Sequence, residues 1–389
     1  MGCALGALGD LPRETVLLLF TMVDCHDADS PWAPLWRSLA PVLTGLTASE
    51  ADVAMLEGTP AHAQVVAARQ HVREQYEGVR PVAEALTAAY PALIPPEHVD
   101  LAAYLSAVEL HYSHALEVDV PGEGVTPCVV PLATLLNHCA TAPHVVRYGT
   151  LSPASRQEAA SCITRDVLEL KALRPCAAGD QVFLSYGPLP NLRALLFYGF
   201  ALEHNPHDTL ALTFEVDRNR SAARSLLQAA LDCHGLIVED CLRSRKRPVD
   251  EEGSGAAALR QAALARHGLT LEHCLRVGGL RARPLVATLR VLAADAADLE
   301  RLCSGDADPL QEPVSAEGER DAVEMLARAL RPLESAYSGA LDAAAARRAD
   351  DRSPFARGAV LFMAGQRAIL CDALATCDAW AAKAGAQDY

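Results

Sequence analysis

Leu135-Leu136-Asn137-His138 stands near the middle of the chain, followed by Val182-Phe183-Leu184-Ser185-Tyr186-Gly187 and then by Leu195-Leu196-Phe197-Tyr198-Gly199-Phe200. The second stretch opens with a short apolar run, which indicates a buried strand that ends at Tyr186. The third stretch has apolar residues at helical spacing and closes on a glycine, which predicts a short helix. The order of the three stretches decides the fold.

The composition is that of a globular protein with room for a sizeable core. Of 389 residues, 51% are hydrophobic and 21% are charged, which favours two domains. The formal net charge of -15 argues against direct nucleic-acid binding, which needs clustered Lys and Arg. An acidic chain of this kind is suited to a basic protein partner.

The 12 cysteines form no Cys-x-x-Cys pair and no compact cluster with zinc-ligand spacing, so no metal site is expected. They are typical of reduced thiols in an intracellular protein of the cytoplasm or nucleus. The apolar run Val16–Val23 is short and lacks a basic flank, so we expect no secretion signal. Because no apolar stretch reaches the length of a bilayer span, we also expect no membrane association. We further expect the protein to be a monomer.

Helical periodicity dominates from Pro12 to about Tyr112. One apolar face is predicted for the first helix, comprising Leu17, Leu18, Met22 and Val23. A second helix is predicted from Val65 to Val79, ending near Arg80-Pro81, and a third from Val99 to His114.

Strand-like runs replace this pattern downstream and are separated by Pro and Gly. The runs are Cys128-Val129-Val130, Val167-Leu168-Glu169-Leu170, Val182-Phe183-Leu184 and Leu210–Val216. Gly179 suits a turn with positive φ, Asn191 suits a helix N-cap, and Gly199 suits the position after a helix end. Helical periodicity returns beyond Arg218, interrupted by loops at Arg243–Gly255 and Ser304–Gly318.

Taken together, these motifs resemble the SET-domain protein methyltransferases of the Rubisco large-subunit methyltransferase type. The resemblance rests on the three opening stretches together with Gly179-Asp180-Gln181, Asn191 and Asn205-Pro206-His207, and on Pro284–Leu292 with Asp298-Leu299-Glu300 downstream. It implies an α+β fold: a SET-domain strand core with a helical insert at roughly 40–120 inside residues 1–209, then an all-α substrate-binding domain over 210–389.

The family resemblance also implies an activity, the methylation of protein lysines with S-adenosylmethionine. It assigns Asn137 and His138 to the cofactor, makes Tyr186 the catalytic tyrosine that also borders the cofactor, and places Tyr198 and Phe200 in the methyl-transfer pocket. We therefore take Tyr186 and Tyr198 as catalytic candidates and Phe200 as a further cofactor neighbour.

The residue chemistry agrees with these roles. Methyl transfer from a sulfonium to an amine is an in-line displacement, which needs alignment and no covalent intermediate. The amine must be neutral to attack, and an apolar channel lined by Phe183, Phe197 or Phe200 lowers its pKa. A hydroxyl such as that of Tyr186 can orient the amine.

Each motif taken alone has a plainer explanation. An Asn-His pair is usually a loop with satisfied hydrogen bonds, and a Tyr-Gly pair at a strand end is usually core or turn chemistry. Cys139 beside His138 suggests cysteine nucleophile chemistry, but no orienting acid lies nearby in sequence and a packed thiol fits better.

Three departures from the family pattern bear on activity. The family begins with strands that carry a glycine-containing turn against the cofactor, whereas this sequence starts in helices, and Gly2, Gly6 and Gly9 follow no strand. His114 aligns where the family usually has an arginine for the cofactor carboxylate, and an imidazole lacks the guanidinium fork. Thr134 stands where relatives often have an acid.

Two functional hypotheses follow. The first is an active S-adenosylmethionine-dependent protein-lysine methyltransferase, and the second is a catalytically impaired SET-fold module that only binds a partner protein. A mis-assigned start, with the strands encoded upstream of Met1, also explains the departure at the N-terminus. No motif names the substrate: a histone, another protein, or a non-lysine acceptor such as a histidine ring nitrogen all stay open.

Overall fold

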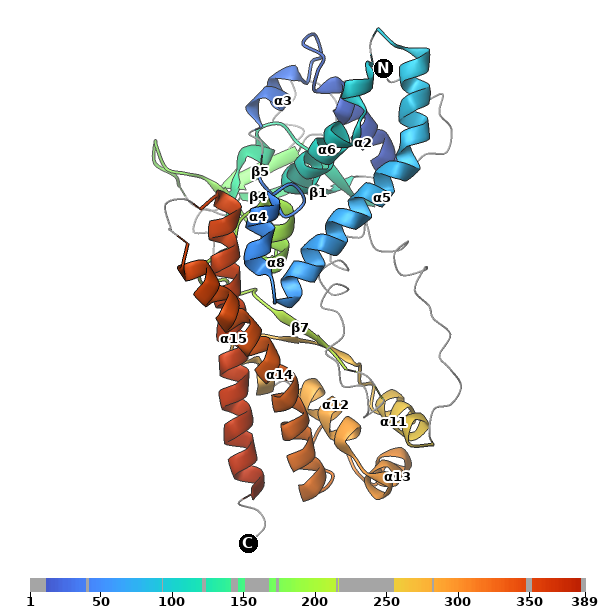
Figure 1. Ribbon diagram of the computed structural model, residues 1–389, viewed down its shortest axis with the longest axis vertical. Coiled ribbons are helices and arrows are strands. Elements are labelled where there is room, and N and C mark those ends of the chain that lie inside the picture. Colours follow the sequence, from blue (N-terminus) through green and yellow to red (C-terminus); the bar gives the residue numbers. More distant parts are fainter. Residues whose placement is uncertain are drawn as a thin grey trace. The chain divides into compact units, whose positions relative to one another are not determined.

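The computed structural model describes residues 12–39, 42–92, 94–120, 124–140, 146–150, 168–172, 175–214, 216, 255–281, 283–347 and 352–385 (Figure 1). The expectations for Gly2, Gly6, Gly9 and Val167, and most of the predicted loop at 243–255, lie outside these residues. The chain divides into two units, of which the first comprises residues 1–48, 67–189 and 196–199, and the second the remainder. The predicted domain boundary after residue 209 stays a prediction.

Helices α2 (Arg13–Asp24) and α6 (Leu101–His114) pack together in the first unit. Leu19, Met22 and Val23 of α2 are buried, whereas Leu17 and Leu18, predicted on the same face, are only half-buried. Helix α6 begins two residues after the predicted start at Val99, because the Asp100 side chain caps it by accepting from the Ala103 amide at 2.8 Å.

Helix α5 (Pro60–Ala89) runs through Pro81, so the predicted end near Arg80-Pro81 is wrong. Proline removes one backbone donor and normally ends or bends a helix. Here the buried stripe of α5 continues beyond it at Ala83 and Leu86, and this burial favours the longer helix despite the lost hydrogen bond.

The segment Leu43–Ala48 is held by two buried charged side chains from α5 and α6. Arg69 donates from Nε to the Gly45 carbonyl at 2.8 Å and also bonds the Ala48 carbonyl. Glu109 accepts from the Thr44 amide at 2.9 Å and from the Thr47 hydroxyl. Because hydrogen bonds to buried charges cost much to break, this segment is fixed to both helices.

The strands pair two by two. In the first unit β1 (Ala115–Val120) is antiparallel to β2 (Gly124–Val129), β4 (Val146–Thr150) is antiparallel to β5 (Leu168–Ala172), and β3 (Asn137–His138) is parallel to β6 (Phe183–Leu184). The predictions located β2, β5 and β6 and missed β1, β3 and β4. A two-residue strand such as β3 has too little alternation to read from sequence.

In the second unit β7 (Leu210–Thr213), which was predicted, pairs with β8 (Glu272–Leu275), which was not. The other regular elements described downstream in this unit are helical, as expected, and include α11 (Gly255–Arg266), α12 (Arg283–Ala293) and α13 (Ala296–Ser304). Helix α12 covers the predicted Pro284–Leu292 stretch.

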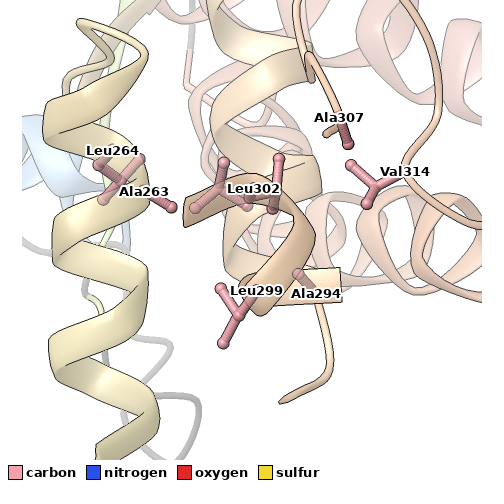
Figure 2. Packing of buried hydrophobic residues seen from close by; sticks show 8 residues of the cluster. Ala263, Leu264, Ala294, Leu299, Leu302, Ala307 and Val314 are labelled. Atoms are coloured by element: carbon pink, nitrogen blue, oxygen red, sulfur yellow. The ribbon is translucent and has the colours of Figure 1, made fainter. Parts of the chain in front are cut away.

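One core of the second unit lies between α11, α13 and the loop after α13. Ala263 and Leu264 of α11 face Leu302 of α13 (Figure 2). The cluster also contains Val291, Ala294, Leu299, Ala307 and Val314. Leu299 and Leu302 are fully buried, and burying a leucine side chain stabilises the fold by about 2 kcal/mol.

Helices α14 (Ala316–Ala345) and α15 (Pro354–Gly385) pack side by side (Figure 1). We expected no segment that could span a bilayer, and this expectation is wrong for α15. Its residues Pro354–Lys383 are long enough and apolar enough to cross a membrane, judged by length and composition only. Buried residues such as Phe355, Phe362 and Leu370 along α15 are also those of a helix packed in a protein core.

Predictions for the turn residues had mixed outcomes. Gly179 and Gly199 have φ of +94° and +73°, as expected. Asn191 is not an N-cap: it is the first residue of α8 (Asn191–Arg193), which follows Pro190, and its side chain is used elsewhere. The helical stretch Ala194–Tyr198 (η4) is a π-helix.

We predict that Gly199→Ala destabilises the first unit strongly. A Cβ at this position would lie 2.2 Å from the Leu43 carbonyl oxygen, in addition to the strain of positive φ, which costs about 1–2 kcal/mol. Gly187→Ala is the matched control, since Gly187 has φ of +89° and open space around it. Urea unfolding should show a clearly larger loss for Gly199→Ala; equal losses would contradict the steric argument.

Candidate active site

The candidate site is built on the parallel pair β3 and β6, which brings the Asn-His stretch beside the stretch that ends at Tyr186. Asn137 pairs with Phe183, and His138 pairs with Leu184. The Cys139 amide donates to the Leu184 carbonyl at 3.3 Å, which extends the pairing by one residue.

Tyr186 is held at both ends by the Asn-His stretch. Its backbone amide donates to His138 Nδ1 at 3.0 Å, and its hydroxyl donates to the Leu136 carbonyl at 2.6 Å. Because Nδ1 accepts a hydrogen bond, the His138 ring carries its proton on Nε2. The two rings lie 5.0 Å apart between centroids.

The second predicted tyrosine lies beside the first. The ring centroids of Tyr186 and Tyr198 are 5.3 Å apart, with the planes tilted by 32°. Burial, and to a smaller extent the neighbouring Tyr198, raises the pKa of Tyr186 to about 12. The Tyr186 phenol is therefore neutral at physiological pH, with its proton directed at a carbonyl and its lone pairs available to accept.

Tyr198 owes its position to the segment Leu43–Ala48. The Gly45 amide donates to the Leu196 carbonyl at 3.0 Å, and Gly199 lies directly against the Leu43 backbone. Since Leu196 and Gly199 flank Tyr198 along the chain, these contacts fix the backbone that carries it.

His114 and Thr134 meet just before the Asn-His stretch in the chain, at the 3₁₀ turn that contains Thr134. His114 Nδ1 lies 3.3 Å from the Thr134 carbonyl oxygen, and burial lowers the pKa of His114 while this contact opposes the shift. Thr134 is buried, yet its hydroxyl has no hydrogen-bond partner among the described residues. An orphaned buried hydroxyl of this kind needs an explanation, and a ligand group is one.

The remaining predicted site residues lie as follows. Asn137 is exposed, and Phe200 is half-buried and belongs to the second unit, where its amide donates to the Ala194 carbonyl at 3.3 Å. Phe197, a candidate for the apolar channel, is buried, and its ring centroid lies 5.0 Å from that of Tyr112. Phe183 is half-buried.

No cluster of His, Cys, Asp and Glu that could hold a metal ion occurs within the described part of the chain.

Three comparisons with known proteins bear on this arrangement. A family model described as Rubisco LSMT substrate-binding matches residues 252–370. N-lysine methyltransferase SETD6 of Mus musculus is 28% identical over 214 residues, which are 52% of this chain and 41% of the mouse protein. The Xenopus laevis setd6 protein is 26% identical over 226 residues, or 55% and 45% of the two chains.

Solved structures agree over nearly the whole chain. The SET domain of LSMT bound to lysine and AdoHcy matches 98% of this chain and 78% of that one, with a TM-score of 0.65 at 17% identity. Rubisco LSMT bound to AdoMet matches with a TM-score of 0.60 at 16% identity, over 97% and 78% of the two chains.

The chain therefore has the fold of the LSMT SET-domain structures, and its residues 252–370 are similar to the Rubisco LSMT substrate-binding family. Its fold is α+β with a helical C-terminal region, as the sequence predicted. The chain spans about two fifths of the length of the SETD6 relatives that it matches.

Sequence reasoning about this LSMT-like chain missed the residues that support the two tyrosines. Leu136 acts through its backbone carbonyl, and Gly45 through its amide, which no side-chain motif can reveal. Leu132 was also missed: it has φ of +67° and ψ of -44°, and the Ala133 amide donates to the Pro131 carbonyl around it at 2.8 Å. This is a strained γ-turn at the start of the Asn-His segment.

We predict that the LSMT-like chain loses stability in acid partly through His111, one turn before His114 on α6. Burial lowers the pKa of His111 to about 4, and its Nε2 has no partner in the described part of the chain. In the unfolded chain a histidine has a pKa near 6.5. As the pH falls from about 6.5 toward about 4, His111 therefore binds a proton in the unfolded state but not in the folded one. The free energy of unfolding decreases by about 3 kcal/mol over this range because of this group.

The measurement is urea unfolding of wild type and His111→Gln from pH 8 to pH 4. From pH 8 to pH 4, wild type should lose about 3 kcal/mol of unfolding free energy relative to His111→Gln. Parallel curves would show that His111 does not titrate as stated.

Proposed function

We propose that the chain is an S-adenosylmethionine-dependent protein-lysine N-methyltransferase. The observation that carries the proposal is the cluster of His138, Tyr186 and Tyr198, in which a neutral tyrosine is held by the Asn-His segment and lies beside the tilted ring of a second tyrosine. The matched SETD6 relatives bear the name N-lysine methyltransferase, and matched LSMT structures contain AdoMet or AdoHcy.

The residues around this cluster fit a cofactor that carries polar groups. The buried Thr134 hydroxyl is unpaired and can bond one such group, and His114, Asn137 and His138 remain the proposed neighbours. His114 is a weak partner for a carboxylate, because burial lowers its pKa and its Nδ1 is placed against the Thr134 carbonyl. S-adenosylmethionine, when bound, supplies an electrophilic methyl group on a sulfonium.

Tyr186 acts in this proposal by orientation and not as a base. A pKa of about 12 leaves its phenol protonated, so it removes no proton from a lysine ammonium at neutral pH. Its hydroxyl donates to Leu136, which leaves the oxygen lone pairs to accept from an amine N–H or a polarised methyl C–H. The amine reaches the neutral state through an apolar surrounding, which lowers its pKa.

The proposed substrate is a basic protein, since the net charge of -15 favours such a partner in an encounter. Histone and non-histone substrates both satisfy this description. The free thiols Cys25, Cys303, Cys371 and Cys377 accord with the proposed intracellular location. The alternative, an impaired module that only binds a partner, gains nothing from the matched relatives, which bear the names of enzymes.

We predict that Tyr186→Phe lowers kcat on a protein substrate by about 10²-fold, because the oriented oxygen is lost while the ring remains. Affinity for S-adenosylmethionine, measured by titration calorimetry, should change less than threefold. Tyr76→Phe is the matched control: it also removes a tyrosine bond to a backbone carbonyl, that of Val99 at 3.2 Å, but within the helical region. Undiminished turnover in Tyr186→Phe would refute the assignment of Tyr186.

We further predict that Thr134→Val separates cofactor binding from stability. Valine has the shape of threonine without the orphaned hydroxyl, so the unliganded protein should gain about 1 kcal/mol. Loss of a cofactor hydrogen bond should weaken S-adenosylmethionine binding about fivefold. Thr87→Val removes another orphaned hydroxyl on α5, so it should raise stability without changing the affinity. Equal affinities of Thr134→Val and wild type would exclude the contact.

A further inference from the structure

A buried carboxylate organises the chain just after the third motif. Asp208 Oδ1 accepts from the Asn191 amide at 3.0 Å, from the Thr209 amide at 3.1 Å and from Gln366 Nε2 at 3.3 Å. Its Oδ2 accepts from Asn191 Nδ2 at 3.1 Å. Asp208 is buried and has no cationic partner among the described residues, so burial raises its pKa while these hydrogen bonds lower it.

Asn191 connects this carboxylate to the backbone beyond Phe200. Its Oδ1 accepts from the Leu202 amide and its Nδ2 donates to the Leu202 carbonyl, each at 2.9 Å. The second Nδ2 hydrogen goes to Asp208, and Asn205 Nδ2 donates to Oδ1 at 3.0 Å. All four hydrogen-bonding positions of the amide are thus used, which leaves Asn191 a single orientation.

Helix α15 contacts Asp208 through the helix face that carries Gln366 and Gly365. Gln366 donates to Asp208 and also to the Thr209 carbonyl at 3.1 Å, and it is almost fully buried. At Gly365 a Cβ would lie 2.7 Å from Asp208 Oδ2, and at Gly358, two turns earlier, a Cβ would lie 3.4 Å from the Ala201 amide nitrogen. The helix therefore approaches Phe200–Leu202 and Asp208 closely enough to determine their position.

This face of α15 belongs to the region that matches the substrate-binding family, residues 252–370. The hydrogen bonds run from that region through Gln366, Asp208 and Asn191 to the backbone at Leu202. Burying a carboxylate without a cationic partner is energetically unfavourable, so Asp208 adds little to stability. Its several directional hydrogen bonds instead fix the relative positions of the groups that donate them.

We propose that Gln366, Asp208 and Asn191 are positioning residues through which helix α15 sets the backbone at Phe200–Leu202, and with it Phe200, which the family resemblance assigns as a cofactor neighbour. The inference rests on the proposed function for its effect on catalysis, and on the contacts above for its effect on structure. Small displacements at a transfer site cost rate far out of proportion to their size.

The test compares Gln366→Met with Ile369→Val, a buried substitution on the same helix at a side chain that makes none of the hydrogen bonds described above. Gln366→Met keeps the length of the side chain and removes both of its hydrogen bonds. We expect it to lower kcat about tenfold or more, with S-adenosylmethionine affinity within twofold of wild type, whereas Ile369→Val keeps kcat and KM. Gln366→Asn, a milder change, replaces Gln366→Met if the latter does not fold.

Hydrogen exchange gives a second readout that needs no activity. Amides of Phe200–Leu202 should exchange faster in Gln366→Met than in Ile369→Val at matched global stability. A kcat equal to wild type in Gln366→Met, or an equal drop in Ile369→Val, would overturn the inference in an active enzyme. If wild type methylates no protein the proposed function fails by itself, and unchanged exchange at Phe200–Leu202 would then overturn the positioning role separately.

Discussion

The position of Tyr198 depends on a close contact of two backbone segments. Gly199 lies so near the Leu43 carbonyl oxygen that only a hydrogen fits in place of a side chain, and the Gly45 amide binds the Leu196 carbonyl. The segment that makes these contacts is itself fixed by Arg69 and Glu109, both buried. Helices α5 and α6, which carry Arg69 and Glu109, therefore help to place Tyr198, whose ring lies beside that of Tyr186.

Tyr186 is constrained from the other side by a pairing that is weak in itself. Two residues of β3 beside two of β6 give few backbone bonds, each worth about 1 kcal/mol. The bonds from the Tyr186 amide to His138 and from its hydroxyl to Leu136 join the same two stretches. The residues expected to perform chemistry thus also hold the strands together, so their substitution should be judged by both turnover and stability.

The sequence alone predicted the fold class and predicted that His138, Tyr186 and Tyr198 belong to one site. Both predictions rest on the order and spacing of the motifs along the chain. It failed where tertiary packing outweighs local preference. Pro81 does not end α5, because Ala83 and Leu86 are buried beyond it. Asn191 has the chemistry of an N-cap, but a carboxylate distant in sequence and the Leu202 backbone use its amide instead. Backbone partners such as Leu136 have no signature at all.

Buried polar side chains in this chain differ in how many of their donors and acceptors are hydrogen-bonded. The difference distinguishes side chains that fix the structure from side chains that are candidates for binding a ligand. Asn191 uses every donor and acceptor within the protein, as expected of a group that fixes structure. Thr134 is also buried, and its hydroxyl has no partner in the part of the chain that the structure describes, although valine would fill the same space without that cost. A bound ligand group is therefore a candidate partner for this hydroxyl. Polar recognition of a small ligand is the role that accords with its place beside the segment that holds Tyr186.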